Sequence, residues 1–339
     1  MGVKGIMEDF RQLVDLASER LGGAVLAAND EFFAPKENLL KPAAPAFLEG
    51  EYTDRGKWMD GWETRRRREP GHDWCLVRLG LAGAIRGVIV DTTHFKGNSP
   101  EACSLEACEI AGHPDTAQLA GEETRWTEIL PRAVLRGDCE NAFVVEIERR
   151  FTHVRFNIFP DGGVARLRVF GLVLPDWDRL ARAGGEVDLA AVENGGLVLS
   201  ASDMFFGSRH NLILPDRGRD MSEGWETRRR RGPGHDWAIL RLGRAGTIRR
   251  AEVDTAHFKG NAPGSCSIDV AHAEEEPVES LMTASGAWRE LLPRTPLQPH
   301  ALHRFEEDLR QAGEATHARL NIFPDGGVSR LRLFARLAP

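Results

Sequence analysis

Apolar and polar residues alternate over short stretches of this chain, and turn residues separate the stretches. Between 164 and 170, leucine and valine alternate with arginine, which is typical of a strand with one buried face. The preceding Pro-Asp-Gly-Gly supplies a turn, so residues 156–170 are predicted to form a β-hairpin. The apolar runs at 74–79 and 237–242 are predicted to be short strands.

Helical spacing of apolar residues is clearest near the N-terminus. Apolar residues stand there at Ile6, Phe10, Leu13, Val14, Leu16, Ala17 and Leu21. The Gly22-Gly23 pair would end such a helix, so a short amphipathic helix is predicted within residues 1–23. This segment lacks the apolar core and small-residue cleavage site of a secretory signal. No apolar run approaches the roughly 20 residues of a membrane helix, and a cytoplasmic protein is expected.

The chain carries the same pattern twice. Residues 61–98 match residues 224–261 at most positions, including the letters GWETRRRR, PGHDW and HFKGN. The match continues in three further pairs of segments: 25–42 with 198–215, 126–132 with 288–294, and 156–170 with 320–334. The period is far too long for a solenoid repeat and indicates a duplicated domain.

The duplication predicts the domain organisation. We expect a first repeat over 24–175, a polar linker over 176–196 and a second repeat over 197–339, after the helix in 1–23. Many short strands separated by turns argue for antiparallel sandwiches rather than a parallel α/β sheet. The predicted fold is therefore mainly all-β, with two tandem jelly-roll-like β-sandwich repeats.

Four consecutive arginines open the polar motif of each repeat, at 65–68 and 228–231. On an extended strand, alternate side chains point to opposite faces, so one pair can face a cleft while the other meets solvent or a carboxylate. A guanidinium group binds a carboxylate or ureido oxygen through two parallel hydrogen bonds. The candidate substrate-binding arginines are Arg65, Arg67, Arg228 and Arg230. The alternative is internal pairing with acidic residues.

A second polar group stands where a predicted strand enters a Gly-Asn loop, and Glu63 and Glu226 precede it. The candidate catalytic residues are Glu63, Asp91, His94 and Lys96 in the first repeat, and Glu226, Asp254, His257 and Lys259 in the second. Imidazole titrates near neutral pH, which suits proton transfer, and a carboxylate can activate water or orient the histidine. An ammonium group could stabilise negative charge. The alternative is a structural histidine under a loop.

Four further residues of the second repeat are candidates for substrate binding: Asn261, His235, Arg209 and His210. Arg209 and His210 are polar residues unique to the second repeat, so the second repeat keeps the fuller polar set and receives more weight. The adjacent His-Asp pairs at 72–73 and 235–236 cannot form a relay, because neighbouring side chains on a strand point apart. The Phe-Phe pairs of both repeats are predicted to be core residues.

Composition narrows the class of partner. The formal net charge of −7 and the single tyrosine argue against nucleic acid and anionic membranes. The five scattered cysteines give no disulfide framework. The chain has no HExxH motif, no His or Cys pair at a recognised ligand spacing, no nucleotide fingerprint and no nucleophile elbow. No cofactor is therefore expected, with a catalytic divalent metal as the alternative.

The long motifs resemble the allantoicase (allantoate amidinohydrolase) family. The resemblance rests on GWETRRRR, GHDW and VDTAHFKGN, on SDMFFGSRHNLILP before them and on the late NIFPDGG strands, and it covers residues 25–334. It implies two jelly-roll repeats similar to galactose-binding sandwiches, usually in homo-oligomers. The implied enzyme is a hydrolase of C–N bonds in linear amidines that converts allantoate to ureidoglycolate and urea in allantoin degradation. The first repeat departs from the pattern at 28–42 and carries an insertion at 43–57.

The candidate residues suit this chemistry. Breaking a C–N bond of allantoate requires a proton for the departing urea and a grip on the carboxylate and the remaining ureido oxygen. Direct attack by water and loss of urea before hydration both fit, and the site could lie in one repeat or both. The alternatives are an enzyme that prefers ureidoglycolate and a non-catalytic tandem β-sandwich that binds a small anion or a sugar.

Overall fold

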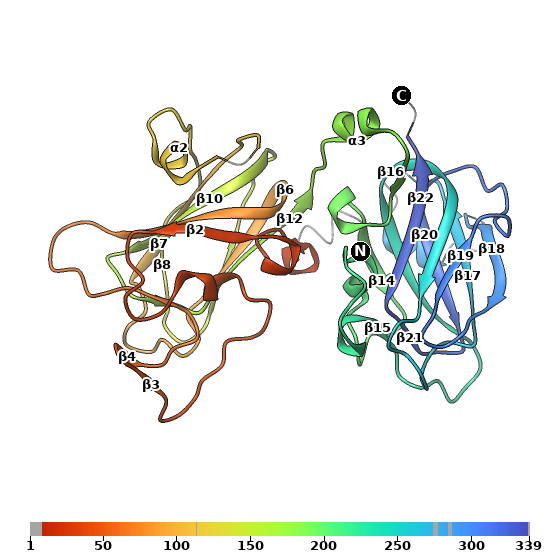
Figure 1. Cartoon of the computed structure of the whole chain (residues 1–339), viewed down its shortest axis with the longest axis horizontal. Helices are drawn as coiled ribbons and strands as arrows, with labels where there is room; N and C mark the ends of the chain where they lie inside the picture. Colours follow the sequence, from red (N-terminus) through yellow and green to blue (C-terminus); the bar gives the residue numbers. More distant parts are fainter. Residues whose placement is uncertain (1–8, 113, 274–276, 284–286, 338–339) are drawn as a thin grey trace. The chain divides into compact units, whose positions relative to one another are not determined.

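The computed structural model describes residues 9–112, 114–273, 277–283 and 287–337. The described chain divides into two compact units, one of residues 9–174 and one that begins at residue 175. In Figure 1 the first unit runs from red to yellow-green and the second from green to blue. Strands dominate both units, as the sequence predicts. Among the residues described, no helix is both long and apolar enough to cross a membrane.

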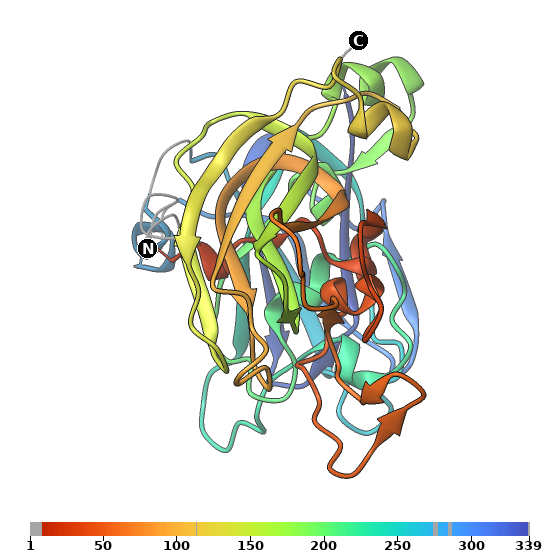
Figure 2. The ribbon, with the colours of Figure 1, turned by 90° about the vertical axis from the view of Figure 1, so that its left-hand side faces the viewer.

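One long strand, β6 (Asp73–Asp91), joins the two layers of the first unit. Its first half pairs with β2 (Ala24–Ala28) and β10 (Arg150–Phe159), and its second half pairs with β9 (Glu140–Val144) and β12 (Arg166–Val173). The first layer continues through β7 (Ala102–Cys108) and β8 (Thr127–Val134), and the second ends at β1 (Val14–Asp15). A strand that passes from one sheet to the other folds the two sheets face to face. In Figure 2 the first unit faces the viewer.

The second unit repeats this topology around β16 (Asp236–Asp254). Its first layer contains β14 (Leu197–Ala201), β20 (Glu314–Phe323), β17 (Ser265–Ala271) and β18 (Arg289–Pro296). Its second layer contains β13 (Glu186–Asp188), β22 (Arg330–Arg336) and β19 (Leu302–Phe305). The prediction of two tandem jelly-roll-like sandwiches is confirmed.

The helices are short and lie between strands. The 3₁₀ helices are η1 (Phe10–Gln12), η2 (Glu19–Leu21), η3 (Lys36–Leu40), η4 (Val192–Asn194), η5 (Arg209–Ile213) and η6 (Met221–Glu223), and the α-helices are α2 (Thr116–Ala120), α3 (Trp177–Ala183) and α4 (Val278–Thr283). Two-residue strands complete the fold: β3 (Tyr52–Thr53), β4 (Gly56–Lys57), β5 (Trp62–Glu63), β11 (Gly163–Val164), β15 (Trp225–Glu226) and β21 (Gly327–Val328). In Figures 1 and 2 the β3–β4 hairpin projects from the end of the first unit opposite α2.

The core of each unit lies between its layers. Alternate residues of β10, Val154, Phe156 and Ile158, are fully buried, as are Leu167 and Val169 of β12. This is the period-2 pattern of a sheet with one face on the core. All five cysteines are free thiols.

The predicted hairpin over 156–170 is wrong in its pairing. Strands β10 and β12 form as expected, but each pairs with β6 instead of with the other. The turn between them leads into β11, which pairs with β5. A local alternation of residue types indicates strands but not their partners, because a third strand from another part of the chain can lie between them.

The predicted N-terminal helix and linker also differ from the structure. Residues 1–8 of the predicted helix lie outside the described residues. Residues 10–21 form η1, β1 and η2 rather than one helix, and β1 pairs with β12. The expected linker contains α3, β13 and η4, and β13 pairs with β22 in the equivalent place. The letters VDLA at 14–17 and 187–190 mark this shared opening of the two units. Each unit therefore starts earlier than the sequence alignment placed it.

A buried phenylalanine holds the loop after β6 in each unit. Phe95 and Phe258 are completely buried. A Cβ atom added at Gly163 would lie 2.0 Å from the Phe95 ring, and one at Gly327 would lie 2.0 Å from the Phe258 ring. The ring therefore packs directly on the backbone of β11 or β21, and only glycine leaves room for it.

We expect Gly327→Ala to lower the free energy of unfolding by about 1–3 kcal/mol, because the added methyl group overpacks the Phe258 site. The shift would be measured as the thermal unfolding midpoint of the full chain. Gly260→Ala is the matched control, since its Cβ would meet no atom within 4 Å. Equal midpoints for the two variants would contradict the role of the contact.

Asp188, at the end of β13, provides a pH-dependent contribution to stability. Burial raises the pKa of its carboxyl group to about 6, although the backbone N–H groups of Leu333 and Ala190 donate to it. The folded chain thus holds this proton more tightly than the unfolded chain, so the free energy of unfolding falls as pH rises through about 4 to 6.

We expect this fall to be about 3 kcal/mol in the wild type and to be missing in Asp188→Asn, whose side chain does not titrate. Urea unfolding of both proteins at about pH 4 and about pH 8 measures the difference. The same pH dependence in both proteins would assign the effect to other groups.

Candidate active site

The loops that carry the polar motif of the first repeat meet at one end of the sandwich, around the ribbon of β5 and β11. Gly163 pairs with Glu63, and Val164 pairs with Trp62. Trp62 is completely buried, and its Nε1–H donates to the carbonyl of Asp30 at 2.8 Å. On the other edge, Phe33 and Ala34 donate to the Glu63 carbonyl at 3.1 and 3.3 Å. The backbone of Glu63 is therefore held on both sides.

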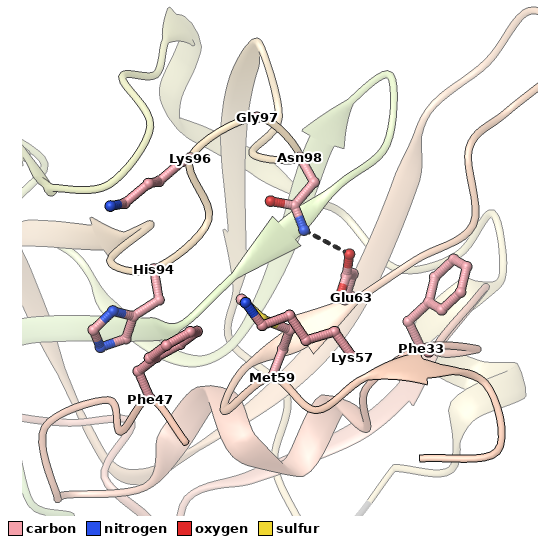
Figure 3. A pocket seen from close by; sticks show the side chains of 10 residues that line it. Phe33, Phe47, Lys57, Met59, Glu63, His94, Lys96, Gly97 and Asn98 are labelled. Carbon is pink, nitrogen blue, oxygen red and sulfur yellow. Dashed lines mark hydrogen bonds between the residues drawn. The ribbon is translucent and has the colours of Figure 1, made fainter. Parts of the chain in front are cut away.

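The Glu63 side chain is oriented by the Gly-Asn loop. Asn98 Nδ2 donates to Glu63 Oε1 at 2.7 Å, and Figure 3 shows this bond across the cavity. Burial raises the pKa of the Glu63 carboxyl group, and the Asn98 amide only partly offsets that effect. A carboxyl group whose pKa is raised can hold a proton closer to neutral pH and deliver it to a reacting atom.

Two cavities share Phe33, Glu63, Gly97 and Asn98 in their walls. The first has a volume of about 430 Å³ and is completed by Phe47, Gly56, Lys57, Met59, His94 and Lys96. The second has a volume of about 560 Å³ and includes Thr64, Arg66, Arg67, Glu101 and Asp161. Both volumes fall in the range of small-molecule sites. The Glu63–Asn98 pair stands where the two cavities adjoin.

The candidate histidine of each repeat has an unusual backbone conformation. His94 has φ 73° and His257 has φ 71°, a left-handed region that residues other than glycine seldom occupy. The N–H of His94 donates to Asp138 Oδ1 at 2.8 Å, and that of His257 donates to His300 Nδ1 at 2.7 Å. Strained backbone of this kind is often retained at functional sites.

The His94 ring lines the first cavity. Its Nε2 lies 3.3 Å from the carbonyl oxygen of Pro45, and its ring centroid lies 5.5 Å from that of Phe47. A carbonyl oxygen only accepts hydrogen bonds, so Nε2 carries the proton in the neutral ring and Nδ1 has the lone pair. In the second repeat, His257 Nε2 lies 3.2 Å from the carbonyl of Gly218.

The candidate lysines Lys96 and Lys259 are exposed side chains of the loops that follow β6 and β16. Lys96 lines the first cavity, and its Nζ lies 3.8 Å from Asp138 Oδ2. Lys259 is exposed in the second repeat, where His300 takes the place of Asp138 in bonding the histidine backbone. The two repeats therefore differ in charge beside their lysines.

All four candidate arginines are engaged in ion pairs. Arg65 pairs with Asp30 at 2.7 Å, and Arg67 pairs with the buried Asp73 at 2.7 Å. Arg228 pairs with Asp203, and Arg230 pairs with Asp236, in the same way. Alternate arginines of the run thus form ion pairs, and Arg66 and Arg67 both line the second cavity. Among the described residues, no carboxylate lies within ion-pair distance of Arg66.

The candidate aspartates Asp91 and Asp254 are the last residues of their strands, and Asp91 lines neither cavity of the first repeat. Both are buried at the ends of β6 and β16. Asp91 Oδ1 accepts from Thr93 N at 2.9 Å, and Asp254 Oδ1 accepts from Ala256 N at 2.8 Å. These hydrogen bonds shape the loop that carries the histidine. Arg217 also donates to Asp254.

The remaining candidates contact other parts of the second repeat. The His235 ring packs on Phe323 and bonds the side chain of Asn321 at 3.2 Å. Arg209 Nε donates to the carbonyl of Val198 at 3.4 Å. Burial, with the nearby Arg209 charge, lowers the pKa of His210 to about 4. His210 is therefore neutral near pH 7 and does not titrate there.

The second repeat keeps the central pair but differs in its surroundings. Asn261 Nδ2 donates to Glu226 Oε1 at 2.5 Å, as Asn98 does to Glu63. Phe205 and Phe206 are 65% and 61% exposed, whereas Phe33 is half-buried. The prediction that these pairs are core residues is wrong, because both pairs lie in the loop that leads to η3 or η5, outside the sandwich.

Sequence reasoning missed Phe47 and Lys57, which complete the first cavity. Both belong to the insertion, which has no counterpart in the second repeat and so offered no internal comparison. The low number of lysines was a usable signal for Lys57. Among the described residues, no three His, Cys, Asp or Glu side chains converge as metal ligands.

Comparisons with known proteins agree on one family. The family model described as "Allantoicase repeat" matches residues 14–174 and 187–338. A probable allantoicase of Pseudomonas paraeruginosa is 51% identical over 96% of this chain and 97% of its own. Probable allantoicase 1 of Burkholderia mallei is 50% identical over 97% and 96%. The crystal structure of allantoicase from Saccharomyces cerevisiae superposes with a TM-score of 0.80 at 36% identity, and covers 98% of both chains. This chain therefore belongs to the allantoicase family.

Proposed function

We propose that this chain hydrolyses allantoate to ureidoglycolate and urea, and that the first repeat carries the reacting groups. Family membership supports the reaction. One observation supports the site more than any other: Glu63, with a raised pKa, is held by Asn98 between two cavities lined by cationic side chains.

The charges around Glu63 suit the substrate. Allantoate has a carboxylate and two ureido groups on one central carbon. Lys96 stands at one cavity and Arg66 at the other, so an anion and a ureido oxygen can be held on either side of the carboxyl group. The guanidinium of Arg66 can donate two parallel hydrogen bonds to a ureido or carboxylate oxygen. This grip would hold the central carbon near Glu63.

In the proposed reaction, the protonated Glu63 donates its proton to the ureido nitrogen that leaves. The bond from this nitrogen to the central carbon breaks, and urea departs. The oxygen of a water molecule bonds to the same carbon, and its proton passes to His94 Nδ1, which has the free lone pair in the neutral ring. Proton transfer from His94 to Glu63 through solvent restores both groups.

We also propose that the chain forms homo-oligomers, as the family resemblance implies, and that it works in the reducing cytoplasm, where its free thiols stay reduced. The exposed apolar side chains of Met204, Phe205, Phe206 and Met221 in the second repeat support association, since apolar groups of this size gain free energy when another surface covers them. Light scattering of the purified chain measures the oligomeric state.

We expect Glu63→Gln to lower kcat for urea release from allantoate by about 100-fold or more, because the amide cannot transfer a proton. Glu226→Gln is the matched control from the second repeat and should keep kcat within about twofold. The measurement is a urea-release assay on both variants with unfolding midpoints checked.

An equal loss in both variants would place chemistry in both repeats, and a loss in Glu226→Gln alone would place it in the second. If the folded wild type releases no urea from allantoate at any pH, with or without divalent metal, the enzymatic function fails. Allantoate binding without urea release would favour the non-catalytic binding protein, and faster turnover of ureidoglycolate would favour the alternative substrate.

We expect Arg66→Met to lower kcat/KM for allantoate by about tenfold or more, the effect of losing a charged hydrogen bond to substrate. Arg68→Met is the control, because Arg68 is an exposed arginine of the same run and lines neither cavity. Unchanged kinetics in Arg66→Met would remove Arg66 from the site.

A further inference from the structure

The first repeat contains a segment that the second repeat lacks. Between η3 and β5, residues 42–60 of the first repeat correspond to the much shorter stretch 215–223 of the second. The extra length forms the β3–β4 hairpin, in which Tyr52 pairs with Lys57. We call residues 43–57 the insertion segment.

A buried guanidinium group holds both ends of the insertion segment. Arg166 of β12 is 1% exposed and donates to the carbonyls of Ala43 at 3.0 Å and Asp60 at 2.9 Å. It also bonds the Asp60 carboxylate at 2.6 Å, which in turn accepts from the N–H of Ala46 at 3.0 Å. The base of the segment is therefore rigid, so its residues can be presented at defined positions.

The middle of the insertion segment forms one wall of the first cavity. The carbonyl of Pro45 contacts His94 Nε2, and the Phe47 ring lies beside the His94 ring. Lys57 Nζ lies 4.3 Å from the centre of the Phe47 ring. Figure 3 shows Lys57 extending into the cavity between Phe47 and Glu63. The Gly56 backbone packs on Phe33, since a Cβ atom added at Gly56 would lie 3.6 Å from the Phe33 ring.

The Lys57 charge is unneutralised. Across the part of the chain that the structure describes, no carboxylate lies within ion-pair distance of its Nζ, and its described partner is the Phe47 ring. Lys96, the other ammonium of this cavity, already has Asp138 at 3.8 Å. A cation that is held on an aromatic face and directed into a small cavity is suited to an anionic group of a ligand.

We infer that Lys57 binds the carboxylate of the substrate and that the insertion segment makes the first repeat selective for anionic ureides. This inference rests on the proposed function and adds the residue that determines which substrates the site accepts. The corresponding stretch 215–223 of the second repeat contains no lysine, so the second repeat lacks this contact. Phe47 covers His94 and limits the access of bulk water to the same wall.

The test is Lys57→Met, which removes the charge and keeps the length of the side chain. We expect KM for allantoate to rise about tenfold or more, while kcat stays within about threefold, because Lys57 holds the substrate and takes no part in proton transfer. Lys57→Arg should restore most of the affinity. Inhibition by methylenediurea, a neutral diureide without a carboxylate, should be unchanged in Lys57→Met.

Arg55→Met is the matched control in the same hairpin. Arg55 donates to the carbonyl of Phe32 and lies over the Phe32 ring, and it does not line the first cavity. An unchanged KM in Lys57→Met, an equal rise in Arg55→Met, or an equal loss of affinity for methylenediurea would each overturn the inference.

Isothermal titration with allantoate accompanies the kinetics and separates the two proposals. If the wild type binds allantoate but releases no urea, the proposed reaction fails, and the carboxylate contact is still judged by the loss of binding in Lys57→Met. If the wild type releases urea and Lys57→Met binds allantoate normally, the reaction stands and the contact fails.

Discussion

The geometry of each repeat depends on an apolar contact, the packing of a phenylalanine ring against bare glycine backbone. Phe95 lies on Gly163, and Phe258 lies on Gly327, at distances that a side chain would not allow. The contact holds the loop after β6 or β16 against the ribbon that carries the glutamate. His94 and Lys96 flank Phe95, and Glu63 pairs with Gly163. The packing of a ring on glycine thus sets the distance between the polar groups of the loop and the glutamate of the ribbon.

Ion pairs then divide the four arginines into different tasks. Arg65 and Arg67 are committed to Asp30 and Asp73, and the buried partner of Arg67 would be costly to leave alone. Arg66, between them, has no carboxylate within ion-pair distance among the described residues and lines the second cavity beside Arg67. The same alternation in the second repeat shows that it is part of the inherited fold. What distinguishes the repeats is the wall built by the insertion, which Arg166 anchors.

The candidate site was only partly predictable from sequence. The duplicated letters singled out Glu63, His94, Lys96 and the arginine run, and the structure brings Glu63, His94 and Lys96 together in the walls of one cavity. They could not separate Asp91, which shapes a turn, from Glu63, which faces a cavity, because both are acidic in both copies. Lys57 was missed because the comparison of two repeats is silent about a segment that one of them lacks.

The sequence by itself determined the duplication, the strand-rich sandwich and the family, because these depend on local alternation and on long matching motifs. Only the tertiary structure decided which strands pair, where each unit begins and which residues line the two cavities of the first repeat. Strands β10 and β12 are neighbours in the chain, yet β6 lies between them, since pairing depends on contacts between distant segments. For the same reason, only the tertiary structure identifies the insertion as a wall of the site, because there Phe47 lies beside His94 and Lys57 lies over the Phe47 ring.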